Sequence, residues 1–188
     1  RTPIREALAR LHSEGIVVRG PDGGYCPAVP DVVVIQELYE VRATLEVQAL
    51  WRPRDVAGRH DEGMLEVLRD DWRSLAADRA EGNDETDPTF VLLDESFHTT
   101  LAEAAGHHAL VELLRQVNER IRVVRMQDFL VAERVSATVE EHLGIVEAVL
   151  SADIGLAETR LRSHMGDSRG FVHARVLEAI ARMTKGHP

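Results

Sequence analysis

The stretch RTPIREALARLHSEGIV, residues 1–17, decides how the chain is expected to begin its fold. Thr2 followed by Pro3 is typical of a helix start, because threonine is a good helix cap and proline fits the first helical position. Gly15 is expected to end this helix. The apolar side chains that share one face of the helix are Ile4, Ala7, Leu8 and Leu11.

A short β-hairpin is predicted to follow. Residues 16–18 form a β-branched run typical of a strand, residues 21–24 (PDGG) form a turn, and residues 25–29 can return as a second strand. The order helix, strand, tight turn, strand corresponds to half of a winged helix-turn-helix domain. A recognition helix places its N-terminal end in the major groove of DNA, where Arg1 and Arg5 could contact base edges or phosphates. An ordinary amphipathic surface helix is the alternative interpretation.

From Pro30 onward the sequence predicts helices only. They are expected at about residues 32–51, 61–80, 88–105, 108–130, 135–150 and 155–183. Six such helices can bury a core as an antiparallel bundle. We therefore predict a mainly α fold in which residues 1–30 are the C-terminal part of a winged helix domain, with its recognition helix and wing, and residues 31–185 are an all-helical domain. The first helix of that domain is expected to bury a stripe of Val34, Leu38, Val41, Leu45 and Ala49.

Composition and charge restrict the possible functions. Aromatic residues make up only 4% of the chain, so the core must consist of aliphatic residues, which favours helices over a sheet. The net charge of −10 argues against a nucleic-acid binder. Residues 1–25, however, carry four arginines against three acids, whereas residues 60–87 carry ten acids against three arginines. Only the N-terminal part is therefore expected to approach phosphates. A single cysteine, Cys26, is typical of a reducing cytoplasm.

Four residues of the helical part could bind a divalent metal. Asp94 and His98 are four positions apart on one helix and therefore share a face. His142 and His164 lie on two later helices. One carboxylate and three imidazoles from three helices can converge inside a bundle, and this donor set suits Zn, Ni, Mn or Fe. A surface ion pair between Asp94 and His98 is the alternative interpretation.

The first stretch resembles a known family of regulators. RTPIREAL, followed by EGIV and a glycine-rich turn, resembles the recognition helix and wing of the GntR family of bacterial transcription regulators. The two helices that precede this motif in the family are not in the sequence, which opens within the motif and is expected to be part of a longer protein. Asp22 stands in the wing where a basic residue would help. The resemblance implies that operator DNA is contacted by Arg1, Thr2, Arg5, Gly23 and Gly24.

The helical part resembles a ligand-binding domain of the same family. LDESFHTTLAEAAGHHAL, EEHLGIVEAV and LAETRLRSHM resemble the metal-binding kind of FCD domain found in the FadR subfamily, over about residues 31–184. The resemblance implies a divalent metal, most often zinc, and an arginine at Arg42 that faces the cavity and pairs with a carboxylate. The effector would be a small acid such as lactate, pyruvate, a sugar acid or a dicarboxylate. The metal ligands that it implies are Asp94, His98, His142 and His164.

We therefore predict a cytoplasmic, DNA-binding repressor that acts as a homodimer and responds to a metal-bound carboxylate effector. Two alternatives are a metal-dependent enzyme with an Asp/His₃ site and a pure metal sensor. The sequence holds no HExxH motif, nucleophile elbow or phosphate loop, which argues against an enzyme. Arg42 argues against a pure metal sensor, which needs no partner for an anion.

Trp51 and Trp72 are expected to pack in the core. We expect a solvated helix face from Arg120, Arg122 and Arg125, and structural or surface roles for His12, His60, His107, His108, His173 and His187.

Overall fold

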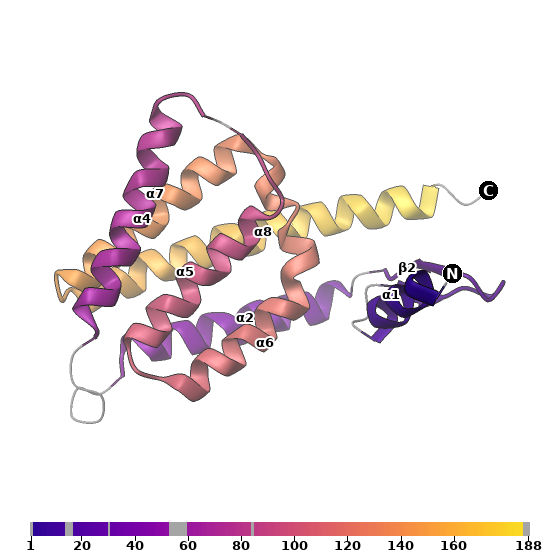
Figure 1. The fold of residues 1–188 in the computed structure, drawn as a ribbon, viewed down its shortest axis with the longest axis horizontal. Coiled ribbons are helices and arrows are strands. Elements are labelled where there is room, and N and C mark those ends of the chain that lie inside the picture. The colour runs from indigo at the N-terminus through magenta and orange to yellow at the C-terminus, as the bar shows by residue number, and fades with distance from the viewer. Residues whose placement is uncertain (1, 14–16, 30, 53–59, 84, 186–188) are drawn as a thin grey trace.

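A helix and a β-hairpin form the N-terminal part of the computed structural model, which describes residues 2–13, 17–29, 31–52, 60–83 and 85–185 (Figure 1). Helix α1 (Thr2–Ser13) is followed by strands β1 (Val17–Arg19) and β2 (Tyr25–Pro27), which pair antiparallel with Val18 opposite Cys26. The connecting turn contains Gly23 at a φ of 78°, a left-handed conformation that glycine adopts without strain. The predicted order of helix, strand, turn and strand is confirmed.

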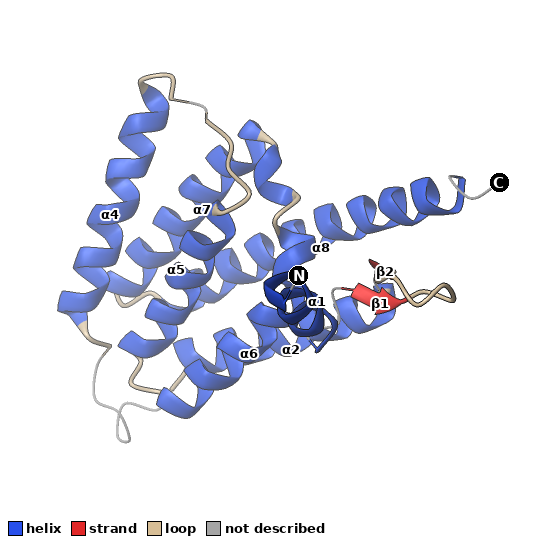
Figure 2. Ribbon diagram, turned by 45° about the vertical axis from the view of Figure 1, so that its right-hand side comes forward, coloured by secondary structure: helices blue, strands red, loops and turns tan. Residues whose placement is uncertain are grey.

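Helices make up the rest of the described chain. They are α2 (Val32–Leu50), α4 (Glu62–Ala80), α5 (Phe90–Ala104), α6 (His108–Arg125), α7 (Ala132–Leu150) and α8 (Ile154–Lys185), with a short 3₁₀ helix η1 (Asp128–Leu130) between α6 and α7. Helix α4 lies against α5 and α7, α2 lies against α6 and α8, and α7 lies against α8. The C-terminal part of α8 extends beyond the bundle toward the side that also holds α1 and the hairpin (Figures 1 and 2). The predicted mainly α fold is therefore confirmed.

Aspartates start three of the bundle helices. The Asp31 side chain accepts hydrogen bonds from the backbone N–H groups of Val33 and Val34, at 2.9 and 3.2 Å, and so caps α2 directly after the hairpin. Asp61 caps α4 through the N–H of Met64 (2.9 Å), and Asp153 accepts from Leu156 N at the start of α8 (3.0 Å). These caps satisfy backbone donors that would otherwise lack a partner within the helix.

The predicted helix over residues 108–130 is too long. Helix α6 ends at Arg125, and the chain turns before η1. The turn buries Asp128 and Phe129, and Phe129 packs with Val91 and Val135 in a small separate cluster. No glycine or proline marks this helix end, so tertiary packing ends a helix that local sequence would have continued.

The buried face of α2 is not the predicted stripe. Leu38 and Ala49 are buried, but Val41 is 47% exposed. The buried face includes two charged residues, Arg42 and Glu46, which are 0% and 2% exposed. These residues form an ion pair with each other, which makes burial of both charges possible. The face that enters the core is therefore partly polar, and a valine lies outside.

The two tryptophans differ in their surroundings. Trp72 is buried at the centre of the core, where it contacts Phe90 and Phe97 edge to face. Trp51 is 52% exposed and donates its Nε1–H to Glu158 on α8 (2.5 Å). The prediction of a core position is confirmed for Trp72 and wrong for Trp51. None of the helices in the described part of the chain is both long and apolar enough to cross a membrane.

Candidate metal centre

The four predicted metal ligands meet in the middle of the bundle. Asp94 and His98 come from α5, His142 from α7 and His164 from α8, and none is more than 1% exposed. One ligand atom from each residue lies within 4.8 Å of the other three. We refer to these four residues as the tetrad. The alternative interpretation of Asp94 and His98 as a surface ion pair is thereby excluded, because both side chains are buried.

The ring nitrogens of the tetrad point toward one another. The Nε2 atom of His164 lies 3.3 Å from the Nε2 atoms of both His98 and His142. Asp94 places Oδ1 at 3.6 Å from His142 Nε2 and Oδ2 at 3.8 Å from His98 Nε2. Three imidazoles and one carboxylate therefore enclose one small volume.

Two carboxylates hold the outer nitrogens of the rings. His98 Nδ1 lies 2.5 Å from Glu46 Oε2, and His164 Nδ1 lies 2.6 Å from Glu141 Oε2. Because an ionised carboxylate only accepts hydrogen bonds, each Nδ1 carries the proton. The Nε2 atoms of His98 and His164 then face each other at 3.3 Å. Two imidazole nitrogens at this distance either share a proton or bind one cation between them.

The donor set fits a divalent metal. A tetrahedral zinc ion with zinc–nitrogen distances of about 2.0–2.1 Å holds its nitrogens about 3.3 Å apart. The two Nε2–Nε2 distances to His164 match this value. Histidine ligands of metals commonly donate their other ring N–H to a carboxylate, as His98 and His164 do here with Glu46 and Glu141. The tetrad thus has the donor types, spacing and outer hydrogen bonds that a metal site needs.

The pKa shifts of the tetrad residues favour the binding of a cation. Burial lowers the pKa of His98 to about 4, although Glu46 opposes the shift. Burial and then the neighbouring His164 lower the pKa of His142 well below its usual value. Burial alone would raise the pKa of Asp94, but Arg125 and His98 hold it well below its usual range. Near neutral pH these rings are neutral and the carboxylate is ionised, which is the protonation state of metal ligands.

His142 is positioned by aromatic packing. Its ring stacks on Phe97 with centroids 3.8 Å apart and an interplanar angle of 7°, and Trp72 contacts it edge to face at 4.3 Å. Its buried Nδ1 has no hydrogen-bond partner within the described residues. Phe97 and Trp72 also line an open groove of about 470 Å³ between α4 and α5. The groove is therefore bounded by the same two rings that support His142.

Arg42 lies beside the tetrad. It is fully buried, its Nε donates to Glu46 Oε1 (2.8 Å), and its Nη2 lies 3.8 Å from Asp94 Oδ2. Arg125 on α6 also lies next to Asp94 and donates from Nη2 to the same Oδ2. Arg125 is only 1% exposed, so the prediction of a solvated position for it was wrong.

The three arginines predicted for one solvated face of α6 have different surroundings. Arg120 is exposed, and Arg122 is partly exposed and pairs with Glu95 at 2.7 Å. Arg125 lies one turn after the buried Ile121, a spacing that could have indicated burial. Sequence reasoning also missed Glu46 and Glu141. Glu46 could have been found from its position four residues after Arg42, but no pattern in the sequence indicates Glu141.

The residues predicted to contact DNA lie on α1 and in the hairpin turn. Arg5 is exposed on α1. Gly23 and Gly24 lie in the turn, where the Asp22 carboxylate accepts a hydrogen bond from Gly24 N (3.0 Å). Arg1 lies outside the described residues, and of Thr2 only the backbone is described. The Asp22 carboxylate thus already serves as a hydrogen-bond acceptor within the turn.

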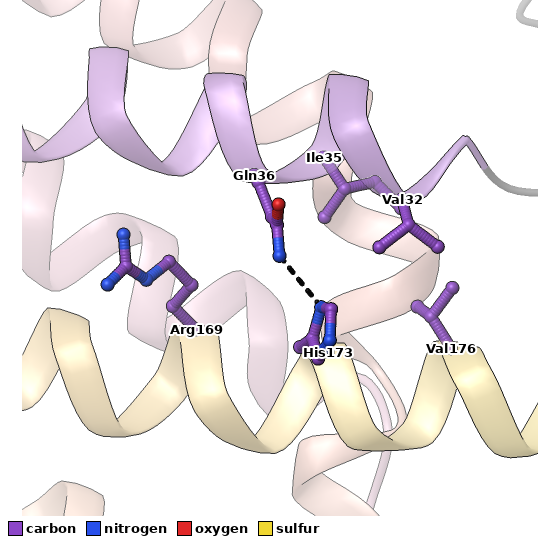
Figure 3. Close-up of a pocket in the computed structure, with 6 residues that line it drawn as sticks. All are labelled: Val32, Ile35, Gln36, Arg169, His173 and Val176. Carbon is purple, nitrogen blue, oxygen red and sulfur yellow. Dashed lines mark hydrogen bonds between the residues drawn. The ribbon is translucent and has the colours of Figure 1, made fainter.

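Polar contacts join α2 and α8 between the tetrad and the end near the hairpin. Tyr39 Oη lies 3.3 Å from Ser168 Oγ, Glu40 lies 3.9 Å from Arg169, and Gln36 Nε2 donates to His173 Nδ1 at 2.9 Å. Figure 3 shows the outer part of this contact, where Gln36 and His173 meet between the two helices. A change in the position of α2 against α8 would therefore alter several specific contacts.

The helical part of the chain matches the model of a known domain family. The match is to the FCD domain and covers residues 37–167, a range that includes the whole tetrad, Arg42 and Arg125. The Nta operon transcriptional regulator of Aminobacter aminovorans is 33% identical over 145 residues, which are 77% of this chain and 64% of that protein. The HTH-type transcriptional repressor GlaR of Escherichia coli K12 is 23% identical over 167 residues, which are 87% of this chain and 75% of GlaR. The chain thus spans less than two thirds of the length of the Nta operon regulator.

Solved structures share the fold. E. coli McbR/YncC matches with a TM-score of 0.67 at 18% identity, over 93% of this chain and 80% of that one. A GntR transcriptional regulator from Rhodococcus sp. RHA1 matches with a TM-score of 0.66 at 22% identity, over 94% of this chain and 79% of that one. The relatives are transcriptional regulators and not enzymes, which removes support from the metalloenzyme alternative. Because the FCD model matches well over half of its residues, the chain belongs to the FCD domain family.

Proposed function

We propose that the chain is part of a repressor that binds operator DNA through α1 and the hairpin and senses a small carboxylate through a divalent metal held by the tetrad. The observation that carries this proposal is the pair of Nε2 atoms of His98 and His164, which face each other at 3.3 Å while both Nδ1 atoms are held by carboxylates. Zinc suits these donors best, and nickel, manganese and iron are further candidates. The name of GlaR as a repressor supports the direction of regulation.

Arg42 gives the site its preference for an anion. A bound divalent ion that takes a fifth ligand beyond the four residues of the tetrad would bind a carboxylate oxygen directly. Arg42 Nη1 and Nη2 have no hydrogen-bond partner in the described part of the chain, and together they form the end of a guanidinium fork. Such a fork matches the two oxygens of a carboxylate. The arginine would therefore select acids over neutral ligands.

Binding at the centre would be coupled to the DNA-binding part through α2. This helix carries Arg42 and begins directly after the hairpin, with Asp31 as its cap, while His164 lies on α8. A ligand that contacts both helices favours one arrangement of α2 against α8. In a homodimer, which we also propose, that preference would change the relative pose of the two DNA-reading heads.

Elemental analysis together with thermal shifts tests the proposal. We expect about one divalent ion per chain, lost in the variants His142→Ala and His164→Ala and retained in the control His173→Ala. In the metal-loaded protein, at least one acid from a panel of lactate, pyruvate, gluconate and succinate should raise Tm, and Arg42→Gln should abolish that shift. Absence of metal would overturn the proposal. Metal without any response to acids would indicate a pure metal sensor instead.

Glu141→Gln is expected to weaken zinc binding by about 10- to 100-fold, because the carboxylate that orients His164 is lost. Glu141 is half-buried and Glu140, its neighbour on α7, is exposed, so Glu140→Gln is the matched control. Zinc affinity is measured by competition with a chromogenic chelator. Equal affinities of the two variants would mean that the hydrogen bond between Glu141 and His164 does not support a metal ligand.

Arg5→Ala is expected to weaken the binding of duplex DNA by the full-length protein and to make it less sensitive to salt. Each lost phosphate contact lowers the slope of log K against log salt by about 0.9. Arg73→Ala is the control, because Arg73 is equally a surface arginine but lies on α4. The measurement is fluorescence anisotropy over a salt series. An unchanged slope for Arg5→Ala would show that α1 does not contact phosphates through this residue.

A further inference from the structure

Two buried guanidinium groups meet at one carboxylate oxygen. Arg42 and Arg125 are 0% and 1% exposed, and both lie next to Oδ2 of Asp94. Each arginine uses a single nitrogen in a hydrogen bond, Nε to Glu46 for Arg42 and Nη2 to Asp94 for Arg125. Among the described residues, no acceptor is found for Nη1 and Nη2 of Arg42 or for Nε and Nη1 of Arg125.

These unpaired donors require an explanation. Buried polar atoms are almost always hydrogen-bonded, and an unpaired donor on a charged group is especially costly. Arg42 alone could bind one carboxylate with its free fork. The free nitrogens of Arg125 remain after that carboxylate is accounted for. The centre therefore has more buried cationic donors than a monocarboxylate can use.

The buried charges also favour an anionic ligand. Arg42 and Arg125 balance Asp94 and Glu46, and all four are at most 2% exposed. A divalent ion would add two positive charges to this neutral set. Burial raises the pKa of Asp128 to about 7, so this nearby carboxyl removes less than one of those charges near neutral pH. A buried charge without compensation costs several kcal/mol. A ligand with one or two negative charges would thus compensate most of the added charge, and the unpaired donors of Arg125 favour the second carboxylate.

Further polar groups lie beside Arg125. Asn118 precedes it by two turns on the buried face of α6, and neither amide atom of Asn118 has a partner in the part of the chain that the structure describes. On the side of α8, Ser168 Oγ donates to Asp128 Oδ2 (3.4 Å) and lies 3.3 Å from Tyr39 Oη. The part of the bundle that holds Arg125 therefore contains further polar groups that can bind oxygen atoms.

We propose that Arg125 is a second anion-binding residue and that the effector is a dianion such as a dicarboxylate, with one carboxylate bound by Arg42 and the other by Arg125. This inference rests on the proposed function, because it specifies the ligand of the same centre. It predicts selection by charge and not by size. Acids of equal length that differ by one carboxylate group should be distinguished.

Succinate and butyrate form a matched pair of probes, because both have four carbons and they differ in one carboxylate. On the zinc-loaded protein, calorimetric titration should show succinate binding at least about 10-fold more tightly, as expected for added charge-assisted hydrogen bonds. Arg125→Lys keeps the charge and a donor for Asp94 but loses the other N–H groups. It should reduce the affinity for succinate to that for butyrate. Arg122→Lys, on the same helix, is the control and should alter neither.

The outcomes separate this inference from the proposed function. Equal binding of succinate and butyrate by the unaltered protein overturns the dianion inference but leaves a carboxylate sensor intact. An unchanged preference for succinate in Arg125→Lys overturns the role of Arg125. If zinc binds and neither these two acids nor the wider panel does, the sensor proposal itself fails. The comparison of the two acids on the unaltered protein does not depend on the folding of any variant.

Discussion

Asp94→Ala is expected to lower the free energy of unfolding of the metal-free protein by about 3–5 kcal/mol, the cost of removing one partner from a buried ion pair. The Asp94 carboxylate accepts a hydrogen bond from Arg125 and lies 3.8 Å from Arg42. Without it, Arg42 would keep its ion pair with Glu46, whereas Arg125 would lose the carboxylate to which it donates. The effect is measured by urea denaturation followed by circular dichroism, in the presence of a chelator so that loss of metal does not contribute.

Two further variants show whether charge is the cause. Asp70→Ala removes a carboxylate that is exposed on α4 and pairs with Arg69, and it should leave stability nearly unchanged. Asp94→Ala combined with Arg125→Met should recover part of the loss, because the unpaired cation is removed together with its partner. A loss in Asp94→Ala no greater than in Asp70→Ala would refute this account of the centre.

Zinc is expected to stabilise the protein by about 4 kcal/mol when its free concentration is a thousand times Kd, because it binds the folded centre and not the separated ligands of the unfolded chain. For a chain of this length that gain corresponds to a rise in Tm of about 8–16 °C. Differential scanning calorimetry with and without chelator measures it. His164→Ala should show no rise, whereas His173→Ala should behave like the unaltered protein. An equal rise in His164→Ala would place the metal outside the tetrad.

The order of the elements could be predicted from sequence because it depends on local signals. Asp31 and Asp61 act as helix caps, and Gly23 lies in the turn of the hairpin. The spacing of Asp94 and His98 put both on one face of a helix. Spacing could not reveal that His142 and His164 approach that face, because this depends on how α7 and α8 pack against α5. The resemblance to a known family supplied that step.

The errors have a common physical origin. A prediction from apolar periodicity assumes that a helix buries its hydrophobic residues. Helix α2 instead buries an ion pair of Arg42 and Glu46, while Val41 is exposed. The same assumption placed Arg125 in solvent, although its partner is the buried Asp94 on another helix. A charged residue enters the core only if a partner meets it there, and a single sequence does not identify partners that come from distant helices.

Because α8 is long, a small tilt at one point along it would displace its far end by a much larger distance. Its 32 residues correspond to about 48 Å, and His164 lies in its first third. The part from His164 to Lys185 is about 31 Å long at the usual helical rise. It reaches past the bundle on the side of α1 and the hairpin (Figure 1). A tilt of only about 5° around His164 would move the far end by nearly 3 Å, which is roughly two residues' rise along a helix. A small change in the position of the His164 imidazole would thus become a larger movement at the far end of α8. That movement would be large enough to shift a neighbouring domain.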